Sequence, residues 1–290
     1  MQRLCLNSNT CYTESYDIIT KFYEKRFDGM PDDDFDTAVN WLFRDSDRKN
    51  LFIKSLNESP ILIRNLIDDI SSLLQVNIWK GKTVVDLGCG SGGACVVFAE
   101  MGAKVIGIEA STGWLKLAKL RIEKFSYLKD KIELHQGNVL NTNIDDSSVD
   151  FCFADQLLEH IVNKERLLIE IERMLRPGAH AFLGFPNRLA LREHHTNNLL
   201  LASYLPKTWS DRYLVLRKKL KPEFSPRPDF LPWPWMIDNI CKNAGLHIKY
   251  FTYVNNFRTL FSRVLHAVNL LFKIKGFSLI VSKPIKSNHS

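Results

Sequence analysis

The N-terminal part of the chain carries apolar residues at helical spacing. Four aromatic and aliphatic side chains share one face of a first predicted helix, and six more form the stripe of a second. These residues are Tyr16, Ile19, Phe22 and Tyr23, followed by Ile61, Ile63, Leu66, Ile67, Ile70 and Leu73. The pattern predicts a helical N-terminal cap over residues 1–79.

Between residues 83 and 185, short apolar runs alternate with stretches of helical periodicity. The predicted strands are 83–87, 104–108, 132–136, 149–154 and 179–185, and the predicted helices are 93–101, 112–125 and 163–175. This alternation predicts a parallel sheet with helices on both faces. Arg176-Pro177-Gly178 is a stop signal that ends the last of these helices and begins the next strand.

Residues 186–233 interrupt the rhythm with prolines among polar and aromatic residues. Long connections of this kind are usually functional, so we interpret this segment as a lid or substrate insertion. A helix near 234–244, a strand near 246–254, a helix near 257–272 and a strand near 277–282 follow, one of these strands antiparallel at the sheet edge. Residues 80–290 are therefore interpreted as one domain, with insertions at 186–233 and 256–275.

Charge is distributed unevenly along the 290 residues. Residues 190–290 contain 16 Lys and Arg against 5 Asp and Glu, although the whole chain has a net charge of only +7. A basic C-terminal third favours an anionic partner, or it is simply a solvated basic surface. The six cysteines show neither C-x-x-C pairs nor metal-ligand spacing, and we expect reduced thiols, no metal and a cytoplasmic location.

A glycine-rich turn follows the first predicted strand. In the sequence from Val84 to Gly93, glycines allow the backbone to approach a ligand at a helix N-terminus, as in nucleotide-binding sites. Gly88, Gly90 and Gly93 also satisfy the dinucleotide-binding pattern, and Glu109 ends the next strand 19 residues after Gly90. The turn alone therefore fits either a nicotinamide cofactor or another nucleoside-containing ligand.

The glycine turn is the first of five motifs that follow one another along the chain. They are Asp86-Leu87-Gly88-Cys89-Gly90-Ser91-Gly92, Glu109, Gln136-Gly137-Asn138-Val139, Asp155-Gln156-Leu157-Leu158-Glu159-His160 and Arg176-Pro177-Gly178-Ala179. With them the sequence resembles the class I S-adenosylmethionine-dependent methyltransferases over roughly residues 80–186. The resemblance implies an α/β fold with a doubly wound, Rossmann-like, mostly parallel seven-stranded sheet, here with a helical N-terminal cap and a lid insertion.

The resemblance also implies S-adenosylmethionine as cofactor. Gly88 and Gly90 would line its methionine and ribose parts, Glu109 would bind the ribose hydroxyls, and Asp155 would lie beside it. Asn138 and Val139 would border the adenine, although family members often carry Asp where this chain has Asn138. Asp86 favours this cofactor over NAD, because a carboxylate attracts a sulfonium cation and repels a pyrophosphate.

Transfer to a hydroxyl acceptor requires a general base. The candidates are His160, His194 and His195. We favour a structural role for His160, and His195 is the first choice for the base, with Glu193 as its partner. Phe185-Pro186-Asn187-Arg188 and Glu193-His194-His195 resemble a subset of these enzymes found in bacterial glycan and cell-surface biosynthesis. The alternative for Glu193 and His195 is that they are ordinary polar residues of a flexible loop.

These observations predict a cytoplasmic methyltransferase that acts on an oxygen of a small molecule or of a glycan or lipid-linked acceptor. A nicotinamide-dependent oxidoreductase and a nucleic-acid methyltransferase or RNA-binding module are the alternatives. No Asn-Pro-Pro-Tyr-type motif follows the fourth strand, which disfavours methylation of amino groups of nucleic-acid bases. The stripe in 257–272 is interpreted as core packing, or as a peripheral contact with an anionic membrane surface.

Overall fold

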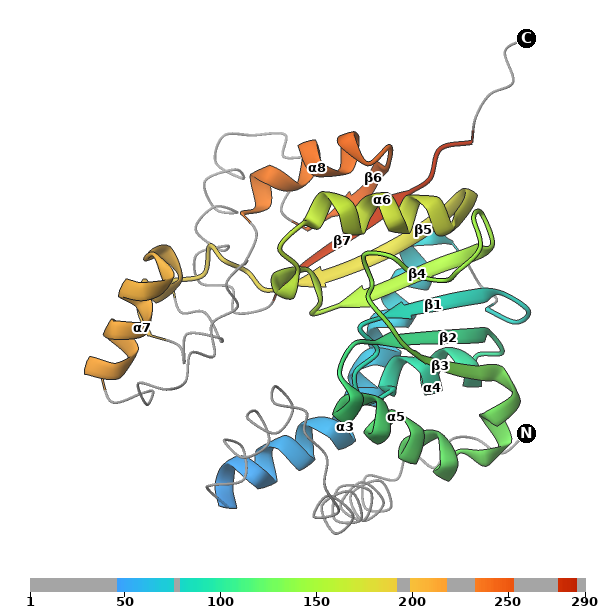
Figure 1. Ribbon diagram of the computed structural model, residues 1–290, viewed down its shortest axis with the longest axis horizontal. Coiled ribbons are helices and arrows are strands. Elements are labelled where there is room, and N and C mark those ends of the chain that lie inside the picture. The colour runs from blue at the N-terminus through green and yellow to red at the C-terminus, as the bar shows by residue number, and fades with distance from the viewer. Residues whose placement is uncertain (1–45, 76–78, 192–198, 218–232, 253–275, 286–290) are drawn as a thin grey trace. The chain divides into compact units, whose positions relative to one another are not determined.

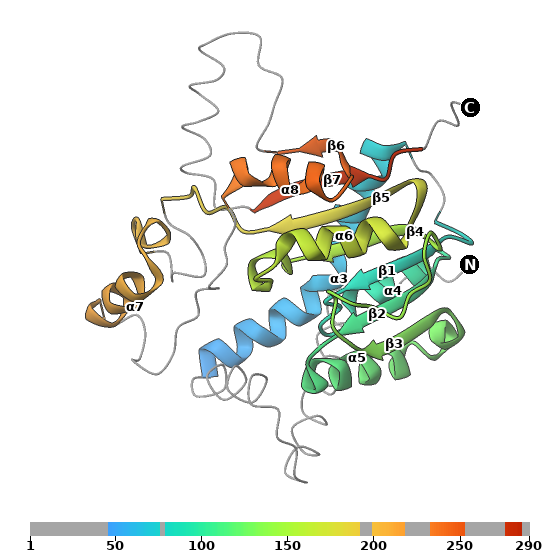
Figure 2. The ribbon, with the colours of Figure 1, turned by 45° about the horizontal axis from the view of Figure 1, so that its top comes forward.

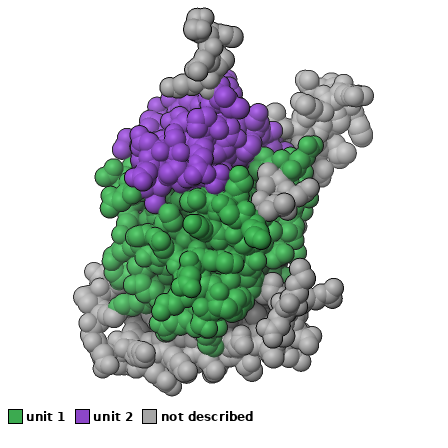
Figure 3. All heavy atoms as spheres, turned by 90° about the vertical axis from the view of Figure 1, so that its right-hand side faces the viewer, with its two compact units in different colours: residues 1–143 green, residues 144–290 purple. Residues whose placement is uncertain are grey.

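The structure, a computed structural model, consists of two compact units, residues 1–143 and 144–290 (Figure 3). The predicted helices before residue 46, the residues Glu193 and His195, and the predicted 257–272 helix lie outside the part of the chain that the structure describes. The described residues are 46–75, 79–191, 199–217, 233–252 and 276–285. The predicted division at residue 79 stays a prediction.

Unit 1 alternates helices and parallel strands (Figure 1). In chain order its elements are α3 (Ser46–Leu74), β1 (Thr83–Leu87), α4 (Gly93–Glu100), β2 (Lys104–Glu109), α5 (Thr112–Lys124), the 3-10 helix η1 (Ser126–Lys131) and β3 (Ile132–Gln136). β2 pairs in parallel with both β1 and β3. Nearly every side chain of α4 is buried, and the helix packs against α3, β1 and β2.

Trp79 connects the end of α3 to α4. Its indole Nε1 donates a hydrogen bond of 2.9 Å to Ser71 Oγ, and its ring meets Phe98 edge-on at 5.1 Å. Ile67 and Ile70, both predicted on the apolar stripe, are buried, whereas Leu73 is exposed. The apolar spacing therefore identified the buried helix face and extended it one turn too far.

Unit 2 contains the second half of the α/β alternation (Figures 1 and 2). Its elements are β4 (Val149–Asp155), η2 (Leu158–His160), α6 (Lys164–Met174), β5 (Leu175–Phe185), η4 (Ala202–Tyr204), α7 (Lys207–Leu216), η5 (Pro234–Met236), α8 (Ile237–Asn243), β6 (His247–Phe251) and β7 (Phe277–Ser282). α6 packs against α8, and α7 packs against η4 around a small core of Leu199, Ala202 and Leu214.

The strands form one seven-stranded sheet in the order β3-β2-β1-β4-β5-β7-β6, which confirms the predicted Rossmann-like fold class. β7 runs antiparallel to β5 and to β6. The predicted antiparallel strand at the edge is β6, which pairs antiparallel with β7, while β7 lies between β5 and β6. The backbone of β7 is satisfied on both sides, and five of its six residues are buried.

The start of β5 also differs from the prediction. α6 ends at Met174, close to the expected position, but the strand begins at Leu175, which pairs with Val149. The register then shifts, so that Phe151 pairs with His180. Arg176-Pro177-Gly178 lies within this irregularity, where proline can be tolerated because it has no N–H to contribute to the ladder. The tripeptide therefore ends the helix as expected but does not precede the strand.

Candidate functional site

The glycine turn between β1 and α4 is held by backbone hydrogen bonds. The N–H groups of Gly88 and Cys89 donate to the carbonyl oxygen of Ile108 on β2, at 2.8 and 3.1 Å. Gly88, Gly90 and Gly92 all have positive φ angles, which L side chains rarely adopt. A Cβ added at Gly90 would meet only Gly88 O, at 4.0 Å, so a ligand can approach this backbone closely.

Glu109 closes the turn from the end of β2. One carboxylate oxygen accepts a hydrogen bond from Gly90 N and the other accepts one from Ser111 N, both at 2.9 Å. Its backbone oxygen accepts from Gly137 N, which ties the end of β3 to the same point. The predicted ribose-binding residue therefore also positions the glycine turn, a role that motif spacing alone did not indicate.

Asp86 lies beneath the turn, almost completely buried at the end of β1. Cys95 Sγ donates to Asp86 Oδ2 at 3.2 Å. A Cβ on the neighbouring Gly107 would lie 2.9 Å from Cys95 Sγ and 3.0 Å from Cys89 Sγ, so glycine is required there. This packing fixes the carboxylate in place beside the glycine turn.

Asn138 follows β3 and its side chain turns back on the chain. Its Oδ1 atom accepts a hydrogen bond of 2.9 Å from Leu140 N, an Asx-turn that explains a short polar residue at this position. The side chain is exposed, whereas Val139 beside it is buried. The amide oxygen predicted to face adenine thus already has one backbone donor, and its second lone pair remains available for another.

Asp155 ends β4 in unit 2 and pairs with Gly184 of β5. The absence of a side chain at Gly184 makes room for the carboxyl group, since a Cβ there would lie 1.9 Å from Asp155 Oδ1. Burial raises the pKa of Asp155 to about 6, and hydrogen bonds from Gln156 oppose the shift. Asp155 is therefore a carboxyl group that can change protonation close to neutral pH.

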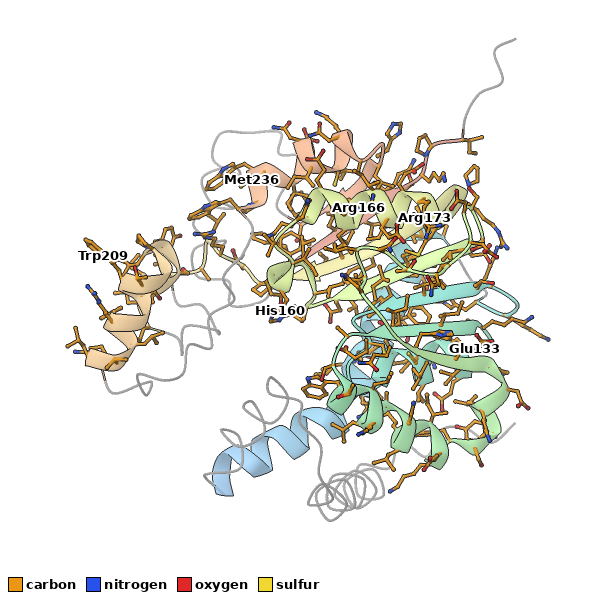
Figure 4. All side chains as sticks on the ribbon, in the orientation of Figure 1. Glu133, His160, Arg166, Arg173, Trp209 and Met236 are labelled. Carbon is orange, nitrogen blue, oxygen red and sulfur yellow. The ribbon has the colours of Figure 1, made fainter. Side chains whose placement is uncertain are left out.

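Glu159, His160 and Lys164 follow β4 on the segment that leads into α6. Glu159 is fully buried, whereas the His160 side chain lies at the surface of unit 2 (Figure 4). Lys164 begins α6 and donates from Nζ to Ile161 O at 2.8 Å. Burial lowers the pKa of Lys164 to about 8, the charge of Arg188 adds to the shift, and the carboxylate of Glu159 opposes it.

A stacked cluster after β5 was not predicted. The guanidinium carbon of Arg188 lies 3.9 Å from the centre of the Trp233 ring, and Trp235 stacks on the same ring at 4.7 Å. Tyr204 contacts Trp233 at 6.0 Å in a tilted arrangement. Arg188 belongs to the Pro-Asn-Arg motif, whereas Trp233 is the last residue of the predicted insertion and was not singled out by the sequence.

The other predicted candidates can be placed only in part. Glu193 and His195 are outside the described residues, so their proposed pairing stays a prediction. Across the described segments there is no group of three or more potential His, Cys, Asp or Glu metal ligands, and no helix there is long and apolar enough to cross a membrane. Among the three catalytic candidates, the structure therefore places only His160.

Residues 85–183 match a family described as Methyltransferase domain. A 2-phytyl-1,4-naphtoquinone methyltransferase of Nostoc punctiforme is 32% identical over 161 residues, which cover 48% of this chain and 70% of that protein. A ubiquinone biosynthesis O-methyltransferase of Cupriavidus pinatubonensis is 30% identical, covering 48% and 53%. A norajmaline N-methyltransferase of Rauvolfia serpentina is 34% identical, covering 42% and 39%. The chain thus spans about half or less of the latter two proteins.

Solved structures show the same fold at low sequence identity. An S-adenosylmethionine-dependent methyltransferase from Mesorhizobium loti superimposes with a TM-score of 0.52 at 15% identity, over 73% of this chain and 96% of that one. The cyclase SpnF gives a TM-score of 0.52 at 16% identity, over 77% and 82%. Because a cyclase shares the fold, the architecture alone does not determine the reaction.

Proposed function

The chain belongs to the class I S-adenosylmethionine-dependent methyltransferase family, and from this we propose that it methylates an oxygen atom of a small-molecule acceptor. The relatives named for naphthoquinone methylation and ubiquinone O-methylation support a small-molecule acceptor, and the name of the Rauvolfia protein supports the same class with nitrogen as the receiving atom. The sequence around Phe185-Pro186-Asn187-Arg188 suggests a more specific acceptor, namely a glycan or a lipid-linked molecule.

The observation that carries the proposal is the Glu109-bound glycine turn of unit 1. A carboxylate at the end of β2 can accept hydrogen bonds from ribose hydroxyls, and Gly90 leaves the backbone accessible. Asp86 supplies a buried negative charge near the same turn. These features fit a cationic nucleoside better than a pyrophosphate, because a fixed carboxylate repels phosphate oxygens.

When bound, S-adenosylmethionine supplies an electrophilic methyl group on its sulfonium centre. The residues of this chain would then bind the nucleoside, align the acceptor and accept its proton. For proton acceptance we propose His195, oriented by Glu193. For cofactor binding we propose Asp86, Gly88, Gly90, Glu109, Asn138, Val139 and Asp155. His160, whose side chain is exposed in η2, is the second candidate for the base, and a structural role is the alternative.

Glu109→Ala tests the cofactor assignment. Titration calorimetry with S-adenosylhomocysteine should show binding weakened by about 1–3 kcal/mol, because charge-assisted hydrogen bonds are lost. Glu109→Gln is the matched variant, which keeps the shape and one acceptor oxygen and should weaken binding less. Unchanged affinity in the alanine variant would refute the ribose-binding role.

The alternative functions predict binding of other ligands, which can be measured separately. A nicotinamide-dependent oxidoreductase would bind NADH and not S-adenosylhomocysteine, which would overturn the proposal. A nucleic-acid methyltransferase would bind RNA or DNA with a steep salt dependence, and lack of binding at low salt removes it. The contact of residues 257–272 with an anionic membrane also stays a proposal, which vesicle sedimentation of the full chain can test.

A further inference from the structure

The helix α7 presents two large apolar side chains to solvent. Trp209 is 64% exposed and projects from the helix (Figure 4), and Leu216 is 79% exposed. The two residues are seven positions apart, which places them on one face of the helix, with the exposed Arg212 between them. Trp209, Arg212 and Leu216 therefore form a single solvent-facing stripe, which we call the α7 face.

The packing of α7 does not require these apolar side chains. The opposite side of the helix carries Leu214, which forms a small core with Leu199 and Ala202. Ser210, four residues before Leu214, is buried on that same side. Because its inner side already holds the helix in place, the α7 face adds apolar area that the core does not use. Exposed apolar side chains grouped in this way indicate a surface that contacts a partner.

The segment before α7 adds two more exposed leucines. Leu200 and Leu201 are exposed, although Ala202 beside them is fully buried. The backbone of Leu201 is fixed, because its N–H donates to Leu191 O at 2.7 Å and its carbonyl oxygen accepts from Tyr204 N at 3.1 Å. Its side chain is therefore held outside the small core. This part of unit 2 thus exposes four large apolar side chains.

The charge around α7 indicates an anionic partner. Residues 207–221 contain six Lys and Arg and one Asp, and the side chains of Arg212 and Arg217 are exposed. Tryptophan and leucine flanked by cations match the surface of an anionic membrane, where indole rings lie at the level of the headgroups and basic side chains are attracted to the lipids. A second copy of this chain would match the apolar side chains but would bring like charges together.

We propose that the α7 face binds the surface of an anionic lipid bilayer. Its two apolar side chains enter the headgroup region, and its arginine, together with Arg217, contacts lipid phosphates. With 10 residues, α7 is shorter than the ~20 that a membrane-spanning helix needs, so it lies in the plane of the interface. The proposal concerns a different segment from residues 257–272, and it does not rest on the proposed methyl transfer.

The test is sedimentation of the full-length protein with vesicles of equal parts phosphatidylcholine and phosphatidylserine, and with vesicles of phosphatidylcholine alone. The parent should sediment with the anionic vesicles, and its partition coefficient for the neutral vesicles should be lower by about tenfold or more. Binding should shift tryptophan emission to shorter wavelength. Trp209→Phe keeps an apolar ring, so it should still bind and show a smaller shift. No sedimentation with anionic vesicles, or equal sedimentation with both, would overturn the proposal.

Substitutions on the α7 face should weaken vesicle binding selectively. Trp209→Ala and Leu216→Ala should each lower the partition coefficient by about tenfold, and Arg212→Gln should lower it by about fivefold. Val162→Ala is the matched control for lost apolar area, because Val162 is an exposed residue of unit 2 outside α7. Arg166→Gln is the control for lost charge, because Arg166 is an exposed cation on α6 (Figure 4). Both controls should bind as the parent does.

The substituted side chains are exposed, so every variant should unfold at the urea concentration of the parent. Affinity for S-adenosylhomocysteine should also be unchanged, so failure of the membrane contact can be distinguished from failure of the proposed function. Parent-like binding by both alanine variants would refute the α7 face and leave residues 257–272 as the membrane contact. A change of oligomeric state in Trp209→Ala, measured by sedimentation velocity, without a change in vesicle binding would make the face an interface between copies and also overturn the proposal.

Discussion

Replacing Gly184 with alanine tests how the carboxyl group of Asp155 is seated at the end of β4. The new Cβ would lie 1.9 Å from Asp155 Oδ1, about 1.5 Å short of ordinary contact, and 3.1 Å from its Cγ. Phe182 Cε1, at 3.2 Å, restricts movement on another side. The Asp155 side chain must therefore rotate away, or β4 and β5 must separate locally.

Either response should lower the free energy of unfolding by about 1–3 kcal/mol, the usual cost of forcing extra volume into a packed site. That is a large fraction of the roughly 5–15 kcal/mol that stabilises a typical domain. Urea unfolding followed by tryptophan fluorescence measures the change. Gln156 N also donates to Gly184 O at 2.8 Å, so a local separation of β4 and β5 would disturb this hydrogen bond as well.

Gly137→Ala is the matched control, because a Cβ there would meet only Ile108 Cγ2, at an ordinary 3.4 Å. It should leave stability unchanged or raise it slightly. In an Asp155→Ala background, Gly184→Ala should cost less than in the parent, because the colliding carboxylate is gone. An alanine variant within about 0.5 kcal/mol of the parent, or an equal cost in both backgrounds, would show that the carboxyl group is seated elsewhere.

Two further substitutions probe unit 2. Arg173→Ala should lower the free energy of unfolding by about 2–4 kcal/mol, because Arg173 donates to the buried Glu170 at 2.8 and 3.1 Å; the partial exposure of Arg173 keeps the effect within this range. Arg166→Ala, at an exposed position, is the control in the same urea series. Equal stability of the two variants would contradict this account. Asp155→Asn should make the free energy of unfolding less dependent on pH. The pKa of Asp155 in the folded protein, about 6, exceeds the ordinary aspartate value of 3.8. The parent is therefore stabilised below pH 4 and loses at most about 3 kcal/mol of that stability as the pH rises through 6. Parallel curves for parent and variant would exclude this titration.

Most strands could be predicted because their apolar runs are short and bounded by turns. β1, β3 and β7 have the predicted limits, and β2 and β4 differ by one residue. The partner of each strand is less visible in sequence, because β7 is a similar apolar run whether it lies at an edge or in the interior. Its placement between β5 and β6 depends on tertiary pairing.

The candidate site, too, could be predicted from the sequence only in part. Gly88, Gly90 and Glu109 could be predicted, because they lie within one strand–turn–helix–strand segment whose spacing fixes their proximity. The Arg188–Trp233 contact joins residues 45 positions apart through an insertion without regular periodicity. The pKa of Asp155 also depends on burial between neighbouring strands, which sequence spacing does not report.

The position of β7 has a consequence for how the protein is assembled. β5 and β6 are each paired with β7 and not with each other, although both precede it in the chain. During synthesis, β6 therefore has no sheet partner until residues 277–282 have been made and inserted. Before that insertion β5 and β6 each present an open backbone edge, the kind of surface at which nascent chains associate. Completing the sheet in unit 2 thus also covers the open edge of β5 and one of the two edges of β6.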